Sequence, residues 1–167
     1  MNDGIEVSKP RLRIELVPRP LWGKTLAKTL PRSKWRALRA WALGRAHNAC
    51  EVCGFRPVDG KGLICHEVWE YDDDQMIQTL AGLEIHCTEC DHVTHFGRTT
   101  TLGQPELVAA ARVRLGRVNG WPPEQVRAYE LAAREQWRAR SAREWIQDLS
   151  WYERWLAGGT EEFLLQQ

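Results

Sequence analysis

The chain has 167 residues, of which 43% are apolar and 27% are charged, and its formal net charge is +1. This length suits one domain, residues 1–167, and is too short for two independent cores joined by a linker. No stretch is apolar and long enough to cross a bilayer, and residues 1–23 lack the apolar core of a signal peptide, so we expect a cytoplasmic protein that makes no membrane contact.

The near-zero net charge hides two blocks of opposite sign. Residues 9–45 hold eleven lysines and arginines against the single acid Glu15, whereas residues 59–91 hold nine acids against one lysine. A basic block with interleaved tryptophans can bind nucleic acid, because cations release counterions from phosphates and indoles stack on bases. We therefore expect residues such as Lys34 and Arg36 to bind substrate. The alternative is a solvated helix face that covers an acidic neighbour.

The first part of the chain, residues 1–45, should form a basic arm followed by a helix. Three prolines interrupt residues 1–23 around a short apolar alternation, which favours an extended arm or an edge strand. From Ser33, a suitable N-cap, apolar residues recur at helical spacing with arginines between them. This helix should lead into the first pair of cysteines.

Residues 46–98 should form a core that is flanked by two metal-binding cysteine pairs. Two C-x2-C pairs supply four thiolates, which close a tetrahedral site and leave no open position for a reaction, so we predict a structural Zn²⁺ ion. The 33 residues between the pairs exceed a simple zinc ribbon and must hold an inserted unit. We expect strands over 63–71 and 80–85 and a short helix that starts near the last cysteine. The four predicted zinc ligands are Cys50, Cys53, Cys87 and Cys90.

The reactive residue types gather within this inserted unit. His66 lies on the first expected strand, and Asp91 and His95 lie four residues apart where the helix should begin, one turn apart on one face. A carboxylate and an imidazole at that spacing can hold a divalent ion. An imidazole that faces them can take a proton from water, because its unperturbed pKa lies near neutrality. The pattern indicates a one-metal phosphodiesterase site.

Over residues 50–98, about a third of the chain, the sequence resembles the HNH, or ββα-metal, nucleases, in particular those bracketed by two zinc-binding C-x2-C pairs. The resemblance implies that Cys65 and His66 are the dyad of metal ligand and general base, and that Asp91 and His95 are metal ligands. It also implies cleavage of DNA rather than RNA. The catalytic divalent ion would be Mg²⁺, Mn²⁺, Ni²⁺ or Zn²⁺.

Three positions depart from the family pattern. Cys65 replaces the usual Asp or His, and a thiolate is a poor ligand for magnesium but a good one for zinc or another transition ion. Asp91 replaces a more usual His. The Asn that orients the base is missing, and Gln78 and Gln75 are its nearest substitutes.

These departures leave two interpretations open. In one, the site uses a modified ligand set drawn from the acidic stretch; in the other, the fold is kept and catalysis is lost. Cys65 is then a small buried residue and His66 a hydrogen-bonded core histidine. The candidate extra ligands are Glu67, Glu70 and Asp72.

Residues 99–167 should form a helical extension. Pro105 opens an expected helix through Val118, and a second begins after the proline pair at 122–123. A last helical segment carries tryptophans near 145–155. Aromatic residues at such spacing usually face the core, and a stacking surface is the alternative.

The sequence as a whole predicts an α+β protein: a zinc-stabilised ββα-metal core with an N-terminal arm and helix and a C-terminal helical layer. The expected function is that of a metal-dependent endonuclease acting on nucleic acid. In it His66 activates water, Asp91 and His95 hold the catalytic ion, and Arg98 holds a phosphate. The alternative is a non-catalytic zinc module that binds nucleic acid or a protein partner.

Overall fold

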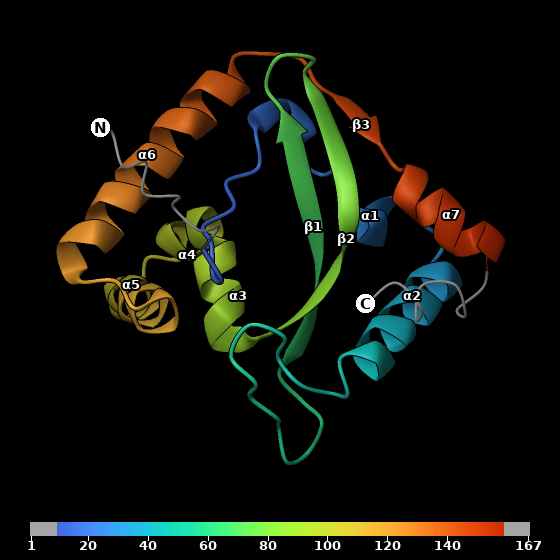
Figure 1. Ribbon diagram of the computed structural model, residues 1–167, viewed down its shortest axis with the longest axis horizontal. Coiled ribbons are helices and arrows are strands. Elements are labelled where there is room, and N and C mark those ends of the chain that lie inside the picture. Colours follow the sequence, from blue (N-terminus) through green and yellow to red (C-terminus); the bar gives the residue numbers. More distant parts are fainter. Residues whose placement is uncertain (1–9, 159–167) are drawn as a thin grey trace, which may run out of the picture.

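A long antiparallel hairpin forms the centre of the fold (Figure 1), in a computed structural model that describes residues 10–158. Strand β1 (Leu63–Asp72) pairs with β2 (Ile77–Cys87), with one bulge between Val68 and Trp69. The two predicted strands are confirmed, and the second is longer than expected. Within the described residues, a short third strand, β3 (Ile146–Asp148), completes a sheet of order β1-β2-β3 by pairing parallel to β2.

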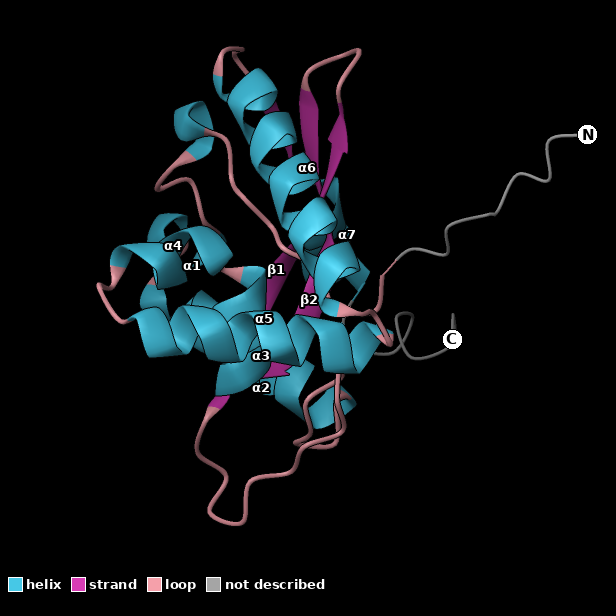
Figure 2. Cartoon of the chain, turned by 90° about the vertical axis from the view of Figure 1, so that its left-hand side faces the viewer, coloured by secondary structure: helices cyan, strands magenta, loops and turns pink. Residues whose placement is uncertain are grey.

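Helices lie on both sides of this hairpin, and the described part of the chain is an α+β fold. Figure 2 shows two of them, α5 and α6, crossing each other on one side. On that side lie α3 (Thr88–Thr94), α4 (Phe96–Thr101), α5 (Pro105–Asn119) and α6 (Pro123–Ser141). On the other side lie α1 (Leu26–Thr29), α2 (Arg32–Arg45) and α7 (Ser150–Gly158). Within residues 10–158, no helix is both long and apolar enough to cross a membrane.

The helix boundaries follow local backbone chemistry. Pro105 and Pro123 occupy the first turns of α5 and α6, where a missing N–H costs little. Gly120 ends α5 in the left-handed region, at φ 69°. The prediction of Ser33 as N-cap is wrong, because α2 begins at Arg32 and its cap is Pro31, two residues before Ser33. The carbonyl of Pro31 accepts the first helical hydrogen bond, from the Trp35 amide at 3.1 Å.

The C-terminal tryptophan segment is not one helix as expected. Residues 146–148 form β3 because the edge of β2 that faces away from β1 has backbone groups available for hydrogen bonding. At the start of this pairing, the Ile146 amide donates to the Met76 carbonyl at 2.9 Å. Trp145 is buried and packs edge-on against Tyr71, with ring centroids 5.4 Å apart. Trp151 is also buried and contacts Trp41. These aromatic residues belong to the core, as predicted.

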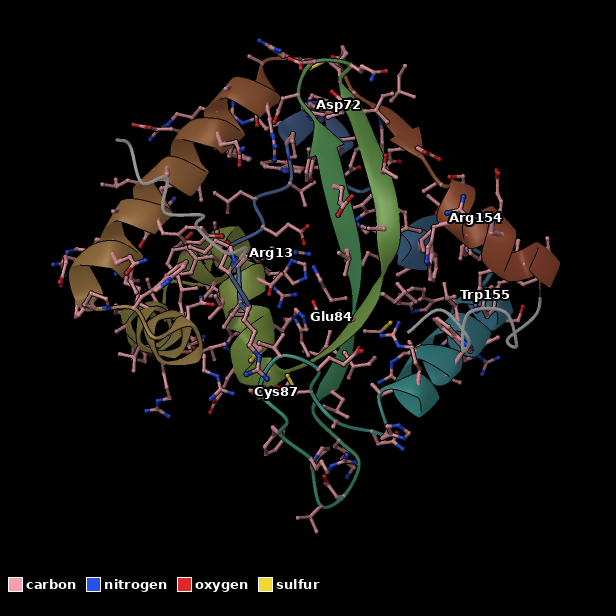
Figure 3. All side chains as sticks on the ribbon, in the orientation of Figure 1. Arg13, Asp72, Glu84, Cys87, Arg154 and Trp155 are labelled. Carbon is pink, nitrogen blue, oxygen red and sulfur yellow. The ribbon has the colours of Figure 1, made fainter. Side chains whose placement is uncertain are left out.

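The N-terminal arm is extended, as predicted, and passes between the hairpin and α6 without joining the sheet. The side chain of Asn119 brackets Leu12, accepting from its amide at 3.1 Å and donating to its carbonyl at 2.7 Å. Farther along, the Glu15 amide donates to the Thr94 carbonyl of α3 at 2.9 Å. The arm also lines a small pocket together with the hairpin, and Figure 3 labels Arg13 and Glu84 from its two walls. Residues 1–9 of the predicted arm lie outside the described residues.

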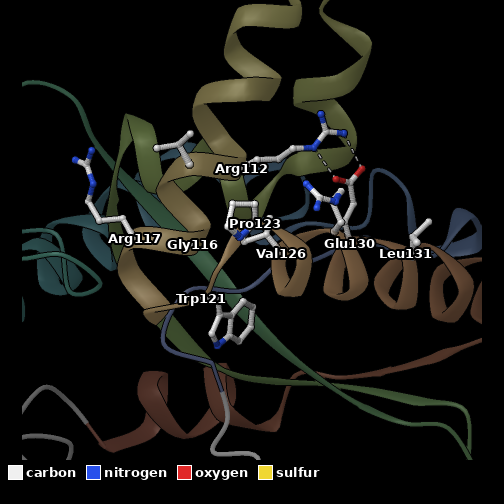
Figure 4. A pocket seen from close by; sticks show the side chains of 10 residues that line it. Arg112, Gly116, Arg117, Trp121, Pro123, Val126, Glu130 and Leu131 are labelled. Carbon is white, nitrogen blue, oxygen red and sulfur yellow. Dashed lines mark hydrogen bonds and ion pairs between the residues drawn. The ribbon is translucent and has the colours of Figure 1, made fainter.

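An ion pair joins the two crossing helices. Glu130 of α6 accepts a hydrogen bond from Arg112 of α5 at 2.8 Å (Figure 4). It also accepts one from Arg134, on its own helix, at 3.0 Å. Burial alone would raise the pKa of Glu130, but the bonds from the two guanidinium groups outweigh it and lower that pKa. The carboxylate is therefore ionised at neutral pH.

We expect Glu130→Gln to lower the free energy of unfolding at pH 7 by about 1 to 2 kcal/mol, because one charged acceptor is lost. The lowered pKa means that this contribution is complete above the unfolded-state value of about 4.3 and is lost as pH falls through the folded-state pKa. Thermal melting of parent and variant should thus differ at pH 7, and the difference should shrink as pH falls below the unfolded-state value. Glu135→Gln, an exposed change on the same helix, is the control. A difference that stays constant as the pH is lowered would contradict the charge argument.

Candidate functional site

The four predicted zinc ligands lie together. The sulfur atoms of Cys50, Cys53, Cys87 and Cys90 are all within 4.8 Å of one another, close enough to hold a metal ion such as zinc. The first pair lies in the loop after α2, where the Gly54 amide donates to the Cys50 carbonyl and Gly54 adopts φ 77°. The second pair brackets the junction of β2 and α3. The cluster therefore joins that loop to the hairpin and the helix.

The surroundings of the cluster suit charged thiolates. The guanidinium of Arg114 lies 3.7 Å from the sulfur of Cys87 and 3.6 Å from that of Cys90. Hydrogen bonds among the sulfurs lower the pKa of the Cys87 thiol and raise the pKa values of Cys50 and Cys90, so the support for negative charge comes from Arg114. A cation beside clustered sulfurs compensates the negative charge that four thiolates leave on a bound divalent ion.

His66, Asp91 and His95, the three predicted reactive residues, meet beside α3. His66 Nδ1 lies 3.3 Å from His95 Nε2, and that nitrogen lies 3.4 Å from Asp91 Oδ1. Asp91 is buried, and its Oδ1 accepts no hydrogen bond from residues 10–158. Among those residues, only the four cysteines bring three or more ligand atoms all within 4.8 Å of one another. The three reactive residues instead form a chain of contacts with His95 at its centre.

Each end of this chain of contacts has a charged partner. Arg98 donates to Asp91 Oδ2 at 2.8 Å and orients the carboxylate. The His66 side chain, in a residue only 5% exposed, bonds through Nε2 to Glu15 Oε2 at 2.5 Å. Burial and the neighbouring His66 lower the pKa of His95, so its imidazole is neutral near pH 7 and can act as a ligand.

Glu15 is the functional residue that the sequence did not reveal. It comes from the arm, 51 residues before its partner His66. Its one distinguishing mark in the sequence is that it is the single acid of the basic block. The two glutamines predicted to stand in for the family Asn do not contact His66: Gln78 bonds to Tyr71 and Gln147, and Gln75 lies in the hairpin turn.

Cys65 faces away from the reactive residues. Neighbouring residues on a regular strand point to opposite faces, so Cys65 lies on the side of α1 and α2 while His66 faces the arm. Glu67, on the same face as Cys65, accepts from the Leu26 amide at 2.8 Å. Burial raises the pKa of the Cys65 thiol to about 12. The implied role of Cys65 as a ligand beside His66 does not fit this arrangement, and it packs as a small buried residue.

The other acidic candidates also lie elsewhere. Asp72 caps the hairpin turn by accepting from the amides of Asp74 and Gln75, both at 2.9 Å. Glu70 is exposed on β1 and lines a different pocket. The acidic stretch therefore adds no donor to the group around His95.

The predicted substrate contacts do not form one surface. Lys34 and Arg36 are exposed on α2, which lies on the opposite side of the hairpin from α3 (Figure 1). Arg98 lies at the reactive residues, and its side chain is 60% exposed. Of these three basic residues, Arg98 alone is placed to contact a phosphate that reacts there.

A pocket of about 510 Å³ opens beside His95. Its walls come from the arm, from α4 and from α6, and they combine aromatic and basic side chains. Its lining includes Glu15, Trp22, His95, Arg98, Arg134 and Trp137. The pocket therefore gives access from solvent to His95.

Comparisons with known proteins give no match: no protein-family model, no curated protein and no solved structure is similar to this chain.

Proposed function

We propose that the protein is a metal-dependent nuclease of the HNH type, in which the four cysteines hold a structural Zn²⁺ ion. Asp91 and His95 hold a catalytic divalent ion, and the substrate is a nucleic acid, with DNA favoured by the family resemblance. The observation that carries the proposal is the convergence of His66, His95 and the unpartnered Asp91 Oδ1 beside an open pocket. The order of β1, β2 and α3 supports a ββα-metal core.

The donor atoms fit a divalent ion. A buried carboxylate oxygen without a hydrogen bond is costly unless a cation or a donor meets it. The separation of 3.4 Å between His95 Nε2 and Asp91 Oδ1 matches two neighbouring ligands on one ion, about 3.0 to 3.4 Å apart when bonds are about 2.1 Å long. A mixed oxygen and imidazole set suits Mn²⁺, Ni²⁺ or Zn²⁺ better than Mg²⁺. Such an ion, when bound, stabilises negative charge on the phosphate and the leaving oxygen.

His66 acts through Nδ1. Its other nitrogen, Nε2, donates to Glu15, so Nδ1 is the ring atom that can take a proton from the attacking water. The Glu15 carboxylate then stabilises the imidazolium that forms, and it takes the orienting role of the missing Asn. Arg98, exposed beside Asp91, binds the phosphate.

Plasmid nicking tests the proposal. We expect the protein to convert supercoiled plasmid to the open circle with at least one of Mg²⁺, Mn²⁺, Ni²⁺ and Zn²⁺, and we expect His66→Ala to slow this by at least about a hundredfold, as loss of a general base does. A parent that cleaves neither this plasmid nor a single-stranded circle with all four ions would leave the non-catalytic zinc module as the better function. Parental cleavage by His66→Ala would remove His66 from the reaction.

A further inference from the structure

We propose that the pocket beside His95 binds an unpaired nucleobase by stacking on Trp22, so that the substrate is single-stranded or locally unpaired nucleic acid. This inference rests on the proposed function, because it names the substrate class of the same site. It concerns a surface remote from α2, where the basic block of the sequence had placed nucleic-acid binding.

Trp22 is a large aromatic residue held in an exposed position. It is 62% exposed, whereas most tryptophans of this chain pack in or against the core. Its indole does not rotate freely, because Nε1 donates to the Val17 carbonyl at 2.8 Å. Trp137 donates to the same carbonyl at 3.0 Å from the other wall of the pocket. A solvent-facing indole that is already oriented offers a stacking platform with little entropy left to lose on binding.

The remaining lining residues suit a nucleotide. The exposed guanidinium of Arg98 supplies positive charge for the phosphate, next to His95. Arg134 adds a second guanidinium on the α6 wall, although its charge is shared with Glu130. The one acidic residue of the pocket, Glu15, is paired with His66 and is therefore less repulsive to a phosphate. The volume of about 510 Å³ lies within the range of small-ligand pockets.

This arrangement selects against intact duplex. A base inside a duplex is covered on both faces by its neighbours, so it cannot lie on the Trp22 indole unless it leaves the stack. An unpaired base needs no such unstacking energy and can enter the pocket while its phosphate reaches Arg98. The pocket therefore accommodates single strands, loops and bulges.

A binding experiment without added divalent ion tests the inference. The probe is a ten-nucleotide oligothymidylate strand that carries one 2-aminopurine, whose fluorescence is quenched when the base stacks. We expect quenching on binding and a Kd about tenfold higher for Trp22→Ala, within the range that one base–aromatic stack contributes. Trp22→Phe should restore much of the affinity. Phe55→Ala, which removes another exposed aromatic far from this pocket, is the matched control.

Two results would overturn the inference: unchanged affinity and quenching in Trp22→Ala, or equal affinity for the same strand in a duplex. Because cleavage is not measured, this outcome is separate from that of the nicking assay. If the base stacks on Trp22 but the protein never cleaves, the nuclease proposal is wrong and base binding in the pocket is supported. If the protein cleaves but Trp22→Ala changes neither affinity nor quenching, the nuclease proposal is supported and base stacking on Trp22 is wrong.

Discussion

Cys90→Ser is expected to remove bound zinc and to unfold much of the chain at 25 °C. Cys90 is fully buried in the first turn of α3, and its sulfur belongs to the four-cysteine cluster. Structural zinc contributes about 10 to 16 kcal/mol in small zinc modules, as much as or more than the net stability of a typical domain, about 5 to 15 kcal/mol. Metal analysis should find about one zinc per parent chain, and circular dichroism should show the loss of structure in the variant.

The fifth cysteine supplies the control for this experiment. Cys65→Ala changes a half-buried thiol on the face of β1 opposite to His66, and this thiol is not part of the cluster. The variant should keep the parental zinc content and show a modest decrease in melting temperature. A parent without zinc, or a Cys90→Ser variant that melts as the parent does, would show that the cluster is not a structural metal site.

The second large effect is expected for Asp91 and His95, the proposed ligands of a catalytic ion. Asp91→Asn and His95→Ala should reduce nicking by at least about a hundredfold at the metal concentration that suffices for the parent. Higher metal should recover part of the activity, because a site that lacks one donor needs more metal to fill. Both variants should keep parental zinc content and melting, since neither residue belongs to the cysteine cluster. His92→Ala, on the same helix, is the control.

In the same assay, His66→Ala tests whether His66 acts as the general base or supports metal binding. If His66 takes the proton, its loss lowers turnover even at saturating metal and leaves the metal requirement unchanged. If the variant instead requires more metal and then recovers, His66 supports metal binding and is not the base. Loss of zinc or of the fold in any of these variants would contradict the separation of the two metal sites.

Local chemistry in the sequence was enough to predict the elements around the cysteines. Each C-x2-C pair must turn sharply to aim two sulfurs at one ion, and prolines mark where α5 and α6 begin. Asp91 and His95 share a helix face by spacing alone. These predictions depend on residues close together in the chain.

Contacts between distant parts of the chain could not be predicted from the sequence. Glu15 bonds to His66 across 51 residues, and no local pattern pairs a lone carboxylate with a particular strand. Gln78 failed as a substitute for Asn because β1 and β2 are long. It lies opposite Tyr71, five residues along β1 from His66 and therefore about 17 Å away. β3 was missed because three residues carry too weak a strand signal.

The threading of the arm sets an order for the assembly of the protein during its synthesis. The first 100 residues already contain the four cysteines, His66, Asp91 and His95, but neither Asn119 nor Trp137. The arm is clamped at Leu12 across 107 residues, so this clamp forms only after α5 has been made, whereas Glu15 can already meet Thr94 and His66. A nascent chain can thus close its cysteine cluster before the arm that carries Glu15 is fixed at Leu12. The final position of the arm is the last feature that the growing polypeptide acquires.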